Sequence, residues 1–408
     1  MSGILAIVSE YNPLHNGHLL HFNHSKKITD ADFSMAVISG NFTQRGDTSI
    51  VNKWVKTEMA LNAGFDIVIE LPTIYSISSA ENFAEGAIKI LNSLGIVDYL
   101  SFGSELGELA PLDDLASILY KEPKELSSLI SQLVKTGISY PKAREMALMQ
   151  IFSENKIYKQ ALTNPNNILG IEYLKALKKY KSRIKPITIK REYSDYNSKT
   201  IKNGIASSTA IRTMLQNNKN IHTVVPYETY ELLEREKNLG KIVTNLKIFE
   251  KEIIYSLRRM TLSEIAQMPD VADGLENRIK IAANNCNNVD DLIENIKSKQ
   301  FTMTRIQRIL LYALLNITQK DMNISRRVTP YIRVLGFNKH GKKIVSAIAK
   351  QNPRVHIVIS VKKFMENNPD ERLRNMIAKD ILATNIYTLG YPNESIANLD
   401  YTHKVIEI

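Results

Sequence analysis

Short runs of apolar, often β-branched residues alternate with longer helical periods over about the first 215 residues, and this pattern constrains the fold most strongly. It predicts an α/β domain in which a parallel sheet is joined by crossover helices. Each expected strand ends near Gly, Pro, Ser or a charged residue, as strands of such sheets commonly do. The expected strands are residues 4–8, 33–38, 67–71, 99–102 and 185–190.

Beyond about Pro226 the pattern becomes mainly helical, with few strand-like runs. Expected helical segments are residues 246–259, 275–284, 289–297 and 304–315. After Pro330 a mixed tail follows, in which residues 355–359 form a possible strand, and the pattern leaves open which domain the tail packs on. We therefore expect two domains: an α/β domain at residues 1–230 and a mainly α-helical, basic domain with a mixed tail at residues 231–408.

The bulk properties exclude several classes of protein. No run of about 18 uncharged apolar residues is present to span a bilayer, and residues 1–8 resemble a buried strand rather than a signal peptide. The only cysteine, Cys286, rules out an internal disulfide, which fits a reducing compartment. We expect a cytoplasmic protein without a membrane partner. Its net charge of +11 favours an anionic partner such as nucleic acid, although charge alone is a weak criterion.

Polar residues follow each expected strand, at the edge where open parallel sheets bind ligands. After the first strand the chain turns at Asn12-Pro13, and a helix is expected to begin near His15. A helix N-terminus favours anions, and Gly17 would remove a side chain that blocks the approach of a nucleotide. His15 and His18 share one face of the first turn, so both can donate to phosphate oxygens and stabilise the charge of a transition state. The segments that follow the strands are residues 10–18, 39–46, 70–72, 103–105 and 191.

The histidines at positions 15, 18, 21 and 24 also allow a metal-site interpretation. Successive members rotate by about 60° around a helix, so His15 and His24 lie on opposite faces and cannot share a metal. Without thiolates, zinc is disfavoured, and no residue is assigned as a metal ligand. A surface position suits His21 and His24 better than it suits His15 and His18.

Two motifs resemble a known superfamily. Residues His15-Asn16-Gly17-His18 are similar to the HxGH signature of the nucleotidyltransferases, and residues 205–212 are similar to the later ISSTxIR motif of that group. The resemblance implies a Rossmann-like nucleotidyltransferase fold in which hydroxyls at a helix start and a following Arg hold the β- and γ-phosphates. Ser207 or Ser208 is a suitable N-cap, and Arg212 lies about one turn later. The phosphate-binding residues expected from this motif are Ser207, Ser208, Thr209 and Arg212.

A narrower resemblance extends over nearly the whole chain. The segments that carry it are residues 10–13, 39–42, 44–46, 53–54, 70–72, 102–105, 139–141 and 165–170. They resemble the bacterial tRNA(Met) cytidine acetate ligases. The resemblance implies an enzyme that activates acetate with ATP to acetyladenylate and then acetylates N4 of the wobble cytidine of elongator tRNA(Met). ATP would be the co-substrate, and Mg²⁺ is expected with it.

The same resemblance implies a set of ATP contacts. Asn166 could take the place of the second asparagine of its segment, and Lys190 that of the neighbouring arginine. The implied contacts are Ile7, Val8, Ser9, Glu10, Tyr11, Asn12, Pro13, Leu14, His15, Asn16, Gly17, His18, Leu19, Leu20, His21, Gly103, Asn167 and Arg191.

Catalytic roles are expected for His15, His18, Lys53 and Glu105. Lys53 could offset phosphate charge, as Arg45 could, and the alternative for both is a solvated surface. The glutamates at positions 10, 70 and 105 each end a strand, and each could bind Mg²⁺, steer acetate, accept a proton or cap a neighbouring helix. The residue types do not single out a general base or an acetate pocket.

Clusters of basic residues in the second domain predict where tRNA binds. On a helix, Arg305 and Arg308 fall on one side, opposite apolar residues that would pack inward. A basic loop containing Gly341 adds two lysines. The expected tRNA contacts are Arg305, Arg308, Arg326, Arg327, Lys342 and Lys343.

Three other functions compete with this interpretation. The main alternative is an adenylyltransferase that joins AMP to a small phosphorylated metabolite, which would leave the basic helical domain without a purpose. A non-catalytic RNA-binding protein does not need both histidines and the motif at residues 205–212. A CoA-dependent acetyltransferase would need a glycine-rich pyrophosphate loop, which the chain lacks.

Overall fold

The computed structural model describes residues 3–152, 155–191, 204–272 and 274–408. Within them one sheet runs through the molecule, in the strand order β5-β4-β1-β2-β3-β6-β7, with β8 paired to β6. All five strands expected from the sequence are present, and they are parallel to one another. They are β1 (Ile4–Ser9), β2 (Phe33–Ser39), β3 (Ile67–Leu71), β4 (Tyr99–Ser104) and β5 (Lys185–Lys190).

The C-terminal tail completes this sheet. Its strands are β6 (Ile332–Phe337), β7 (Ile357–Val358) and β8 (Ile406–Glu407). β6 pairs with β3 in the antiparallel direction, and all six of its residues are buried. A strand that is buried in this way needs neighbours over both of its faces and along both of its edges. The free edge of β3 provides one of these neighbours. The expected division at residue 230 is therefore wrong for the tail, because the tail belongs to the α/β unit.

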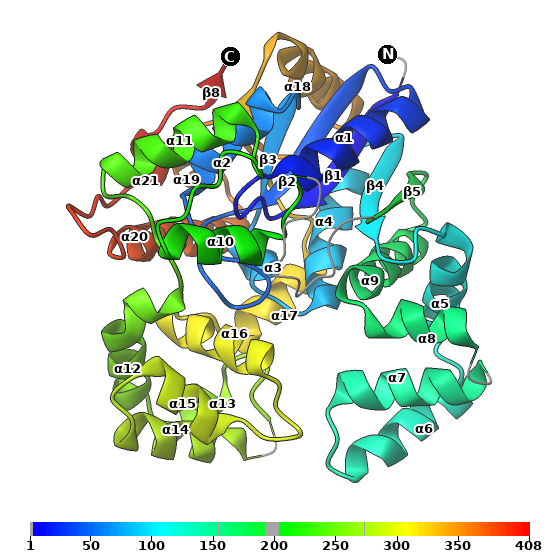
Figure 1. Ribbon diagram of the computed structural model, residues 1–408, viewed down its shortest axis with the longest axis vertical. Helices are drawn as coiled ribbons and strands as arrows, with labels where there is room; N and C mark the ends of the chain where they lie inside the picture. The colour runs from blue at the N-terminus through cyan, green and yellow to red at the C-terminus, as the bar shows by residue number, and fades with distance from the viewer. Residues whose placement is uncertain (1–2, 153–154, 192–203, 273) are drawn as a thin grey trace.

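Helices cover both faces of the sheet (Figure 1). In β1, Leu5 and Ile7 face one hydrophobic core while Ile4 and Ala6 face the other, as the two-residue period of a strand requires. The first face is covered by α1 (Asn16–Thr29), α2 (Lys53–Asn62), α10 (Ser208–Gln216) and α11 (Tyr227–Asn238). The second core is built from α3 (Thr73–Ser76), α4 (Ala80–Leu94), α5 (Leu109–Lys121), α9 (Pro165–Lys179), α18 (Lys339–Gln351) and α20 (Glu371–Thr388).

Two groups of helices extend from the sheet on either side of a gap in Figure 1. We call α6 (Lys124–Lys135), α7 (Tyr140–Ile151) and α8 (Lys156–Thr163) the insertion lobe. The helical lobe consists of η1 (Leu246–Phe249), α12 (Glu250–Arg259), α13 (Leu262–Ala266), α14 (Leu275–Asn285), α15 (Val289–Ile296) and α16 (Met303–Leu314). Its residues form most of a separate hydrophobic core, to which Phe42, Ile77 and α20 also contribute. All four helical segments expected in this region are present. The remaining helices are α17 (Gln319–Arg327), α19 (Val361–Asn367) and α21 (Leu399–Thr402).

None of the described helices combines the length and the apolar character that crossing a bilayer requires.

Candidate active site

A cavity of about 520 Å³ opens at the carboxyl ends of β1 and β4, the edge that the sequence predicts. Its size is typical of a site for a small molecule or cofactor. The walls come from the loops after β1 and β2, from α1, α4, α9 and α10, and from the helical lobe. The lining residues are Ile7, Val8, Ser9, Glu10, Tyr11, Asn12, His15, His18, His21, Thr43, Gln44, Arg45, Asp47, Ala80, Phe83, Phe102, Gly103, Pro165, Asn166, Leu169, Tyr173, Arg191, Ser207, Ser208, Thr209, Arg212, Met303, Thr304 and Gln307.

The two histidines of the first motif lie against each other at the start of α1. Their rings stack with centroids 3.7 Å apart, and Tyr11 meets His18 edge-on at 5.1 Å. The backbone N–H of His15 donates to Nδ1 of His18 over 3.3 Å. Neutral His18 therefore carries its proton on Nε2, which makes Nε2–H its donor.

Gly17 makes room for this arrangement. A Cβ atom at position 17 would lie 3.0 Å from Cε1 of His15. The space that the sequence analysis assigned to a nucleotide is thus occupied by the His15 ring. Gly17 acts on the site by allowing His15 to take its position.

Burial keeps these histidines neutral. Burial, followed by the charges of Arg191 and Arg212, lowers the pKa of His15 to about 3. Burial and Arg191 lower the pKa of His21 to about 3 as well, and burial holds the pKa of His18 well below its usual value. At neutral pH the histidines are hydrogen-bond donors without charge, while the arginines of the cavity supply the positive charge.

This arrangement predicts a pH-dependent stability. Below about pH 6.5 the histidines of the unfolded chain take up protons that the folded chain excludes, so the free energy of unfolding falls as the pH falls. Each excluded proton contributes a slope of about 1.4 kcal/mol per pH unit. Urea unfolding between pH 7.5 and 5.0 should show a shallower slope for His15→Gln than for the unmodified protein. Asn23→Gln, at an exposed position on the same helix and without a titratable group, is the control and should leave the slope unchanged.

The second motif lies across the cavity, at the start of α10. Ser207 is the N-cap, and its Oγ accepts from the backbone N–H of Ala210 at 3.1 Å. Arg212 lies one turn further on and donates to the carbonyl of Asn12 at 2.9 Å. The structure thus brings the two motifs together, although nearly 200 residues separate them in the sequence.

Arg191 forms the wall beside Gly103, because a Cβ atom at Gly103 would lie 3.3 Å from Cγ of Arg191. Its neighbour Lys190 packs against Gly107 instead. Of the two candidates at this position, Arg191 is the one that lines the cavity.

Only part of the expected stretch from Ile7 to His21 lines the cavity. Leu14 is buried in the core below α1, and the side-chain amide of Asn16 donates to the carbonyls of Gly204 and Thr223. His21, for which a surface position seemed to fit better, lines the cavity and lies 2.9 Å from Oγ of Ser101. Residues of this stretch outside the cavity wall are Pro13, Leu14, Asn16, Gly17, Leu19 and Leu20.

Glu105 and Asn167 fasten β4 to α9. Glu105 accepts from the backbone N–H of Asn167 at 3.0 Å, and Oδ1 of Asn167 accepts from the N–H groups of Glu105 and Leu106. Neither residue lines the cavity, and Asn167 is fully buried. The expected catalytic role of Glu105 is not supported, because its carboxylate caps a neighbouring helix. Asn166 is the asparagine of this segment that reaches the cavity.

The expected catalytic role of Lys53 also has to be corrected. Its side chain is fully buried, with Nζ 2.9 Å from Glu70 and 2.7 Å from Asp400. It lies outside the cavity wall, so it cannot offset phosphate charge there. Glu70 is committed to the same ion pair, which leaves Glu10 and Asp47 as the carboxylates that line the cavity.

No group of three or more His, Cys, Asp or Glu side chains within the described ranges is arranged to hold a metal ion.

Lys56 organises the two loops behind the site. Its buried Nζ donates to the carbonyls of Glu10 (3.0 Å), Ser39 (2.7 Å) and Gly40 (2.6 Å), and it also contacts Oγ of Ser49 at 3.0 Å. Burial lowers the pKa of Lys56 to about 7. One ammonium group thus joins the ends of β1 and β2.

We expect Lys56→Met to destabilise the protein by about 2–4 kcal/mol, because it leaves several buried carbonyls without a donor. Nucleotide affinity should fall as well, since both loops contribute to the cavity. Urea unfolding and titration with a fluorescent ATP analogue would measure the two effects. Lys27→Met, at an exposed position on α1, is the matched control. Unchanged stability and affinity in Lys56→Met would contradict this assignment.

The helical lobe closes one side of the cavity with Met303, Thr304 and Gln307. The loop after β2 is pressed against α16, because a Cβ atom at Gly46 would lie 2.5 Å from the backbone N of Arg308. Sequence reasoning missed this wall, since nothing local in α16 indicates which loop it will touch.

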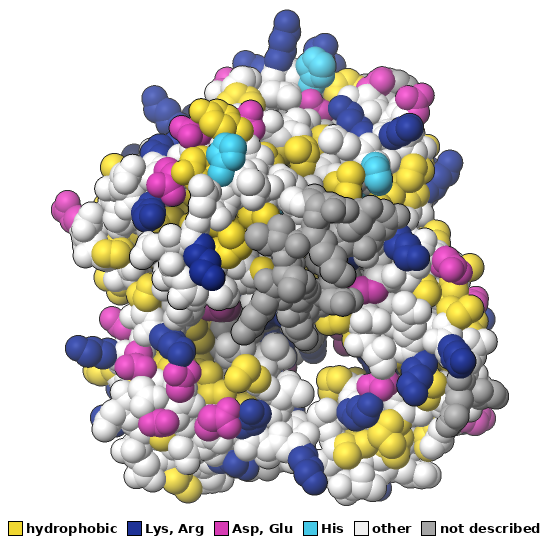
Figure 2. Space-filling model, viewed as in Figure 1, with side chains coloured by type: hydrophobic (Ala, Val, Ile, Leu, Met, Phe, Trp, Pro, Cys, Tyr) yellow, Lys and Arg dark blue, Asp and Glu magenta, His cyan; other side chains and the backbone are white. Residues whose placement is uncertain are grey.

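The basic residues expected to bind tRNA are dispersed. Arg308 is mostly buried and pairs with Asp270 at 3.0 Å, and Nε of Arg305 donates to the carbonyl of Asp270. Arg308 is therefore a structural residue rather than part of an open phosphate-binding face. In Figure 2, Lys and Arg side chains are scattered over the visible face.

The other four residues that were expected to bind tRNA lie on two separate helices. Arg326 and Arg327 are exposed at the end of α17. Lys342 and Lys343 are exposed in the first two turns of α18, so their segment is a helix and not the expected loop. That helix begins beside Asp66, at the amino end of β3, whereas the cavity lies at the carboxyl ends of the strands. Its lysines therefore lie toward the opposite end of the strands from the cavity.

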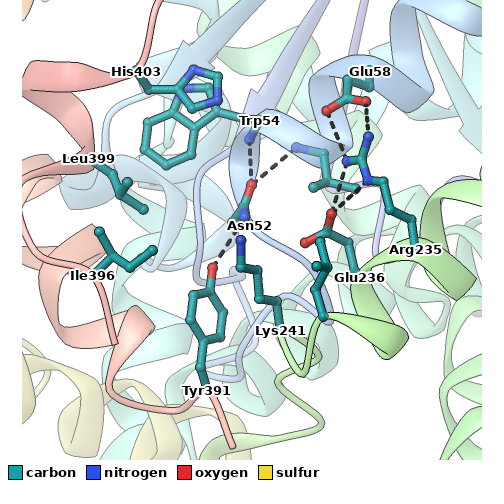
Figure 3. A pocket seen from close by; sticks show the side chains of 12 residues that line it. Asn52, Trp54, Glu58, Arg235, Glu236, Lys241, Tyr391, Ile396, Leu399 and His403 are labelled. Atoms are coloured by element: carbon teal, nitrogen blue, oxygen red, sulfur yellow. Dashed lines mark hydrogen bonds and ion pairs between the residues drawn. The ribbon is translucent and has the colours of Figure 1, made fainter. Parts of the chain in front are cut away.

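A second cavity, of about 270 Å³, lies between α2, α11 and the C-terminal segment (Figure 3). Trp54 stacks on His403 at 4.4 Å, and Arg235 is ion-paired with Glu58 and Glu236. Asn52 donates to the hydroxyl of Tyr391 at 3.2 Å. The polar side chains of this cavity thus have partners among one another. Their contacts hold the C-terminal segment against α2, and we do not assign this cavity as the active site.

A mainly parallel sheet, two stacked histidines at the start of the first helix, and an N-capping serine with a following arginine across the cavity are typical of a nucleotidyltransferase of the HIGH type. The family model described as HIGH Nucleotidyl Transferase matches residues 2–401.

Close relatives narrow this class. The tRNA(Met) cytidine acetate ligase of Thermoanaerobacter sp. (strain X514) is 45% identical, with 100% of both chains covered. That of Acetivibrio thermocellus is 41% identical, with 99% of both covered. The crystal structure of Thermotoga maritima TmcAL, in its apo form, superposes with a TM-score of 0.95 at 31% identity, over 100% of this chain and 99% of that one. The form bound with alpha-thio ATP gives 0.93 at the same identity and coverage. The chain belongs to the tRNA(Met) cytidine acetate ligase family.

Proposed function

We propose that this protein uses ATP to activate acetate as acetyladenylate and then acetylates N4 of the wobble cytidine of elongator tRNA(Met). The observation that carries the proposal is the cavity, which holds the stacked pair His15–His18 opposite Arg212. Full-length relatives named tRNA(Met) cytidine acetate ligase, and a similar structure bound with alpha-thio ATP, support it.

The chemistry proceeds in two steps. A carboxylate oxygen of acetate attacks the α-phosphorus of ATP, and the bond to the β-phosphate oxygen breaks, which releases pyrophosphate. N4 of cytidine then attacks the acetyl carbonyl, AMP leaves with the bonding electron pair, and the nitrogen loses a proton. Preplaced donors stabilise the charge of the first transition state more than that of the ground state.

Residue roles follow from their positions. His15 and His18 donate to phosphate oxygens, and Arg212 with the hydroxyls of Ser207, Ser208 and Thr209 holds the β- and γ-phosphates. Arg191, Gly103 and Asn166 contact the nucleoside end. Mg²⁺ would be held mainly by the triphosphate with Glu10 or Asp47, the carboxylates that line the cavity, because this ion usually binds one or two carboxylates together with phosphates.

Transfer RNA would approach where the helical lobe meets the cavity, with the exposed Arg326 and Arg327 as phosphate contacts. Lys342 and Lys343 can take part only if the RNA extends around the sheet. The protein would act in the cytoplasm, where its RNA substrate is found.

The test is to incubate the protein with ATP, labelled acetate and unmodified elongator tRNA(Met), and to measure acetylcytidine by nucleoside mass spectrometry. We expect label in RNA with ATP and acetate and none with acetyl-CoA. If AMP is instead joined to a phosphorylated metabolite while RNA stays unlabelled, the chain is an adenylyltransferase of the alternative kind.

A further inference from the structure

The two sides of the cavity differ in chemistry. The side toward α1 and α10 is polar and carries the histidines and Arg212. The opposite side belongs to the core between the sheet, α4 and α9, and several of its residues are deeply buried. This apolar half is lined by Val8, Ala80, Phe83, Phe102, Leu169 and Tyr173.

Tyr173 is the exceptional residue of the apolar half. Its side chain is 1% exposed, and its ring lies 5.8 Å from that of Phe102. Among the described residues, its buried hydroxyl has no hydrogen-bond partner. A buried hydroxyl without a partner costs stability, and such groups in native proteins commonly serve a function. Burial raises the pKa of Tyr173, so the hydroxyl stays protonated and acts as a donor.

A ligand for this half needs one oxygen acceptor and a small apolar group. A short carboxylic acid has both, since one oxygen can accept from the tyrosine while the methyl group packs against leucine and phenylalanine side chains. Arg45 and Arg212 line the same cavity near Glu10 and offset the negative charge of the acid.

We propose that the apolar half is the acyl subsite, in which Oη of Tyr173 donates to an oxygen of acetate and Leu169 limits the length of the acyl chain. This inference rests on the proposed function and adds to it the residues that select the acid. Tyr173 acts as a binding residue for the reacting carboxylate.

The first test is Tyr173→Phe, assayed by acetate-dependent exchange of pyrophosphate into ATP. We expect the KM for acetate to rise about tenfold, since one hydrogen bond to a charged oxygen is lost, while the KM for ATP stays unchanged. Thermal stability should stay the same or rise, because an unpartnered buried hydroxyl is removed.

Tyr180→Phe is the matched control. Tyr180 ends the same helix, but its hydroxyl donates to Glu85 at 2.6 Å and lies outside the cavity wall. This variant should lose stability and keep the KM for acetate.

The second test is Leu169→Ala with propionate in place of acetate. The larger space should raise the ratio of kcat/KM for propionate to that for acetate at least tenfold, the usual effect of one methylene group in a pocket. An unchanged KM for acetate in Tyr173→Phe, or a raised KM for ATP in its place, overturns the inference. If the unmodified protein shows no acetate-dependent exchange, the proposed function fails and the inference with it.

Discussion

His18→Ala is expected to lower acetyladenylate formation by a factor of a hundred to a thousand while RNA binding stays nearly unchanged. The side chain supplies a donor at the cavity, and loss of one such preplaced donor typically costs about 3–4 kcal/mol of transition-state stabilisation. His18 also supports His15, because the rings stack at 3.7 Å and Nδ1 accepts the backbone N–H of His15.

Acetate-dependent pyrophosphate exchange measures the first effect, and filter binding of elongator tRNA(Met) measures the second. His24→Ala, on the exposed side of the same helix, is the control. If RNA binding disappeared while the exchange reaction continued, the assignment of His18 to adenylate formation would be wrong.

Asp400→Ala should destabilise the protein by about 3–5 kcal/mol, the usual effect of breaking a buried ion pair. Burial by itself would lower the pKa of Lys53, but Asp400 and Glu70 outweigh it and hold that pKa above its ordinary value. Arg333 lies 3.6 Å from Asp400, so two cations and two anions are balanced in the protein interior. Loss of one anion leaves an uncompensated positive charge.

A double variant tests whether charge balance between Lys53 and Asp400 explains the loss of stability. Lys53→Met combined with Asp400→Asn removes one charge of each sign and leaves Glu70 beside Arg333, its partner in the β3–β6 ladder. We expect this double variant to be more stable to urea than Asp400→Ala. A double variant at least as unstable as the single one would show that charge balance is not the reason for the effect.

The sequence predicts what is local. Strands β1 to β5 could be recognised because buried parallel strands are continuous apolar runs. His15 and His18 could be paired because residues three apart share a helix face.

The errors concern contacts between distant segments. β6 is equally apolar, but its partner β3 lies far away in the sequence. Lys53 resembled a surface residue because lysine is seldom buried without a partner. One of its partners is Asp400, which is too far away in the sequence to be recognised as such. Glu105 caps α9, which begins some 60 residues later. No periodicity within one segment could reveal these pairs.

The pairing of β6 with β3 has a consequence for how the chain reaches this fold. The sheet needs strands from both ends of the sequence, so much of its structure has a high contact order, and such pairings form slowly. During synthesis the strands β1 to β5 leave the ribosome with one edge of β3 uncovered and with Lys53 lacking one of its acids. The helical lobe, whose core comes mostly from neighbouring residues, can form before that edge is covered. An exposed sheet edge at this stage is a site for aggregation, and it is the late arrival of β6 that closes it.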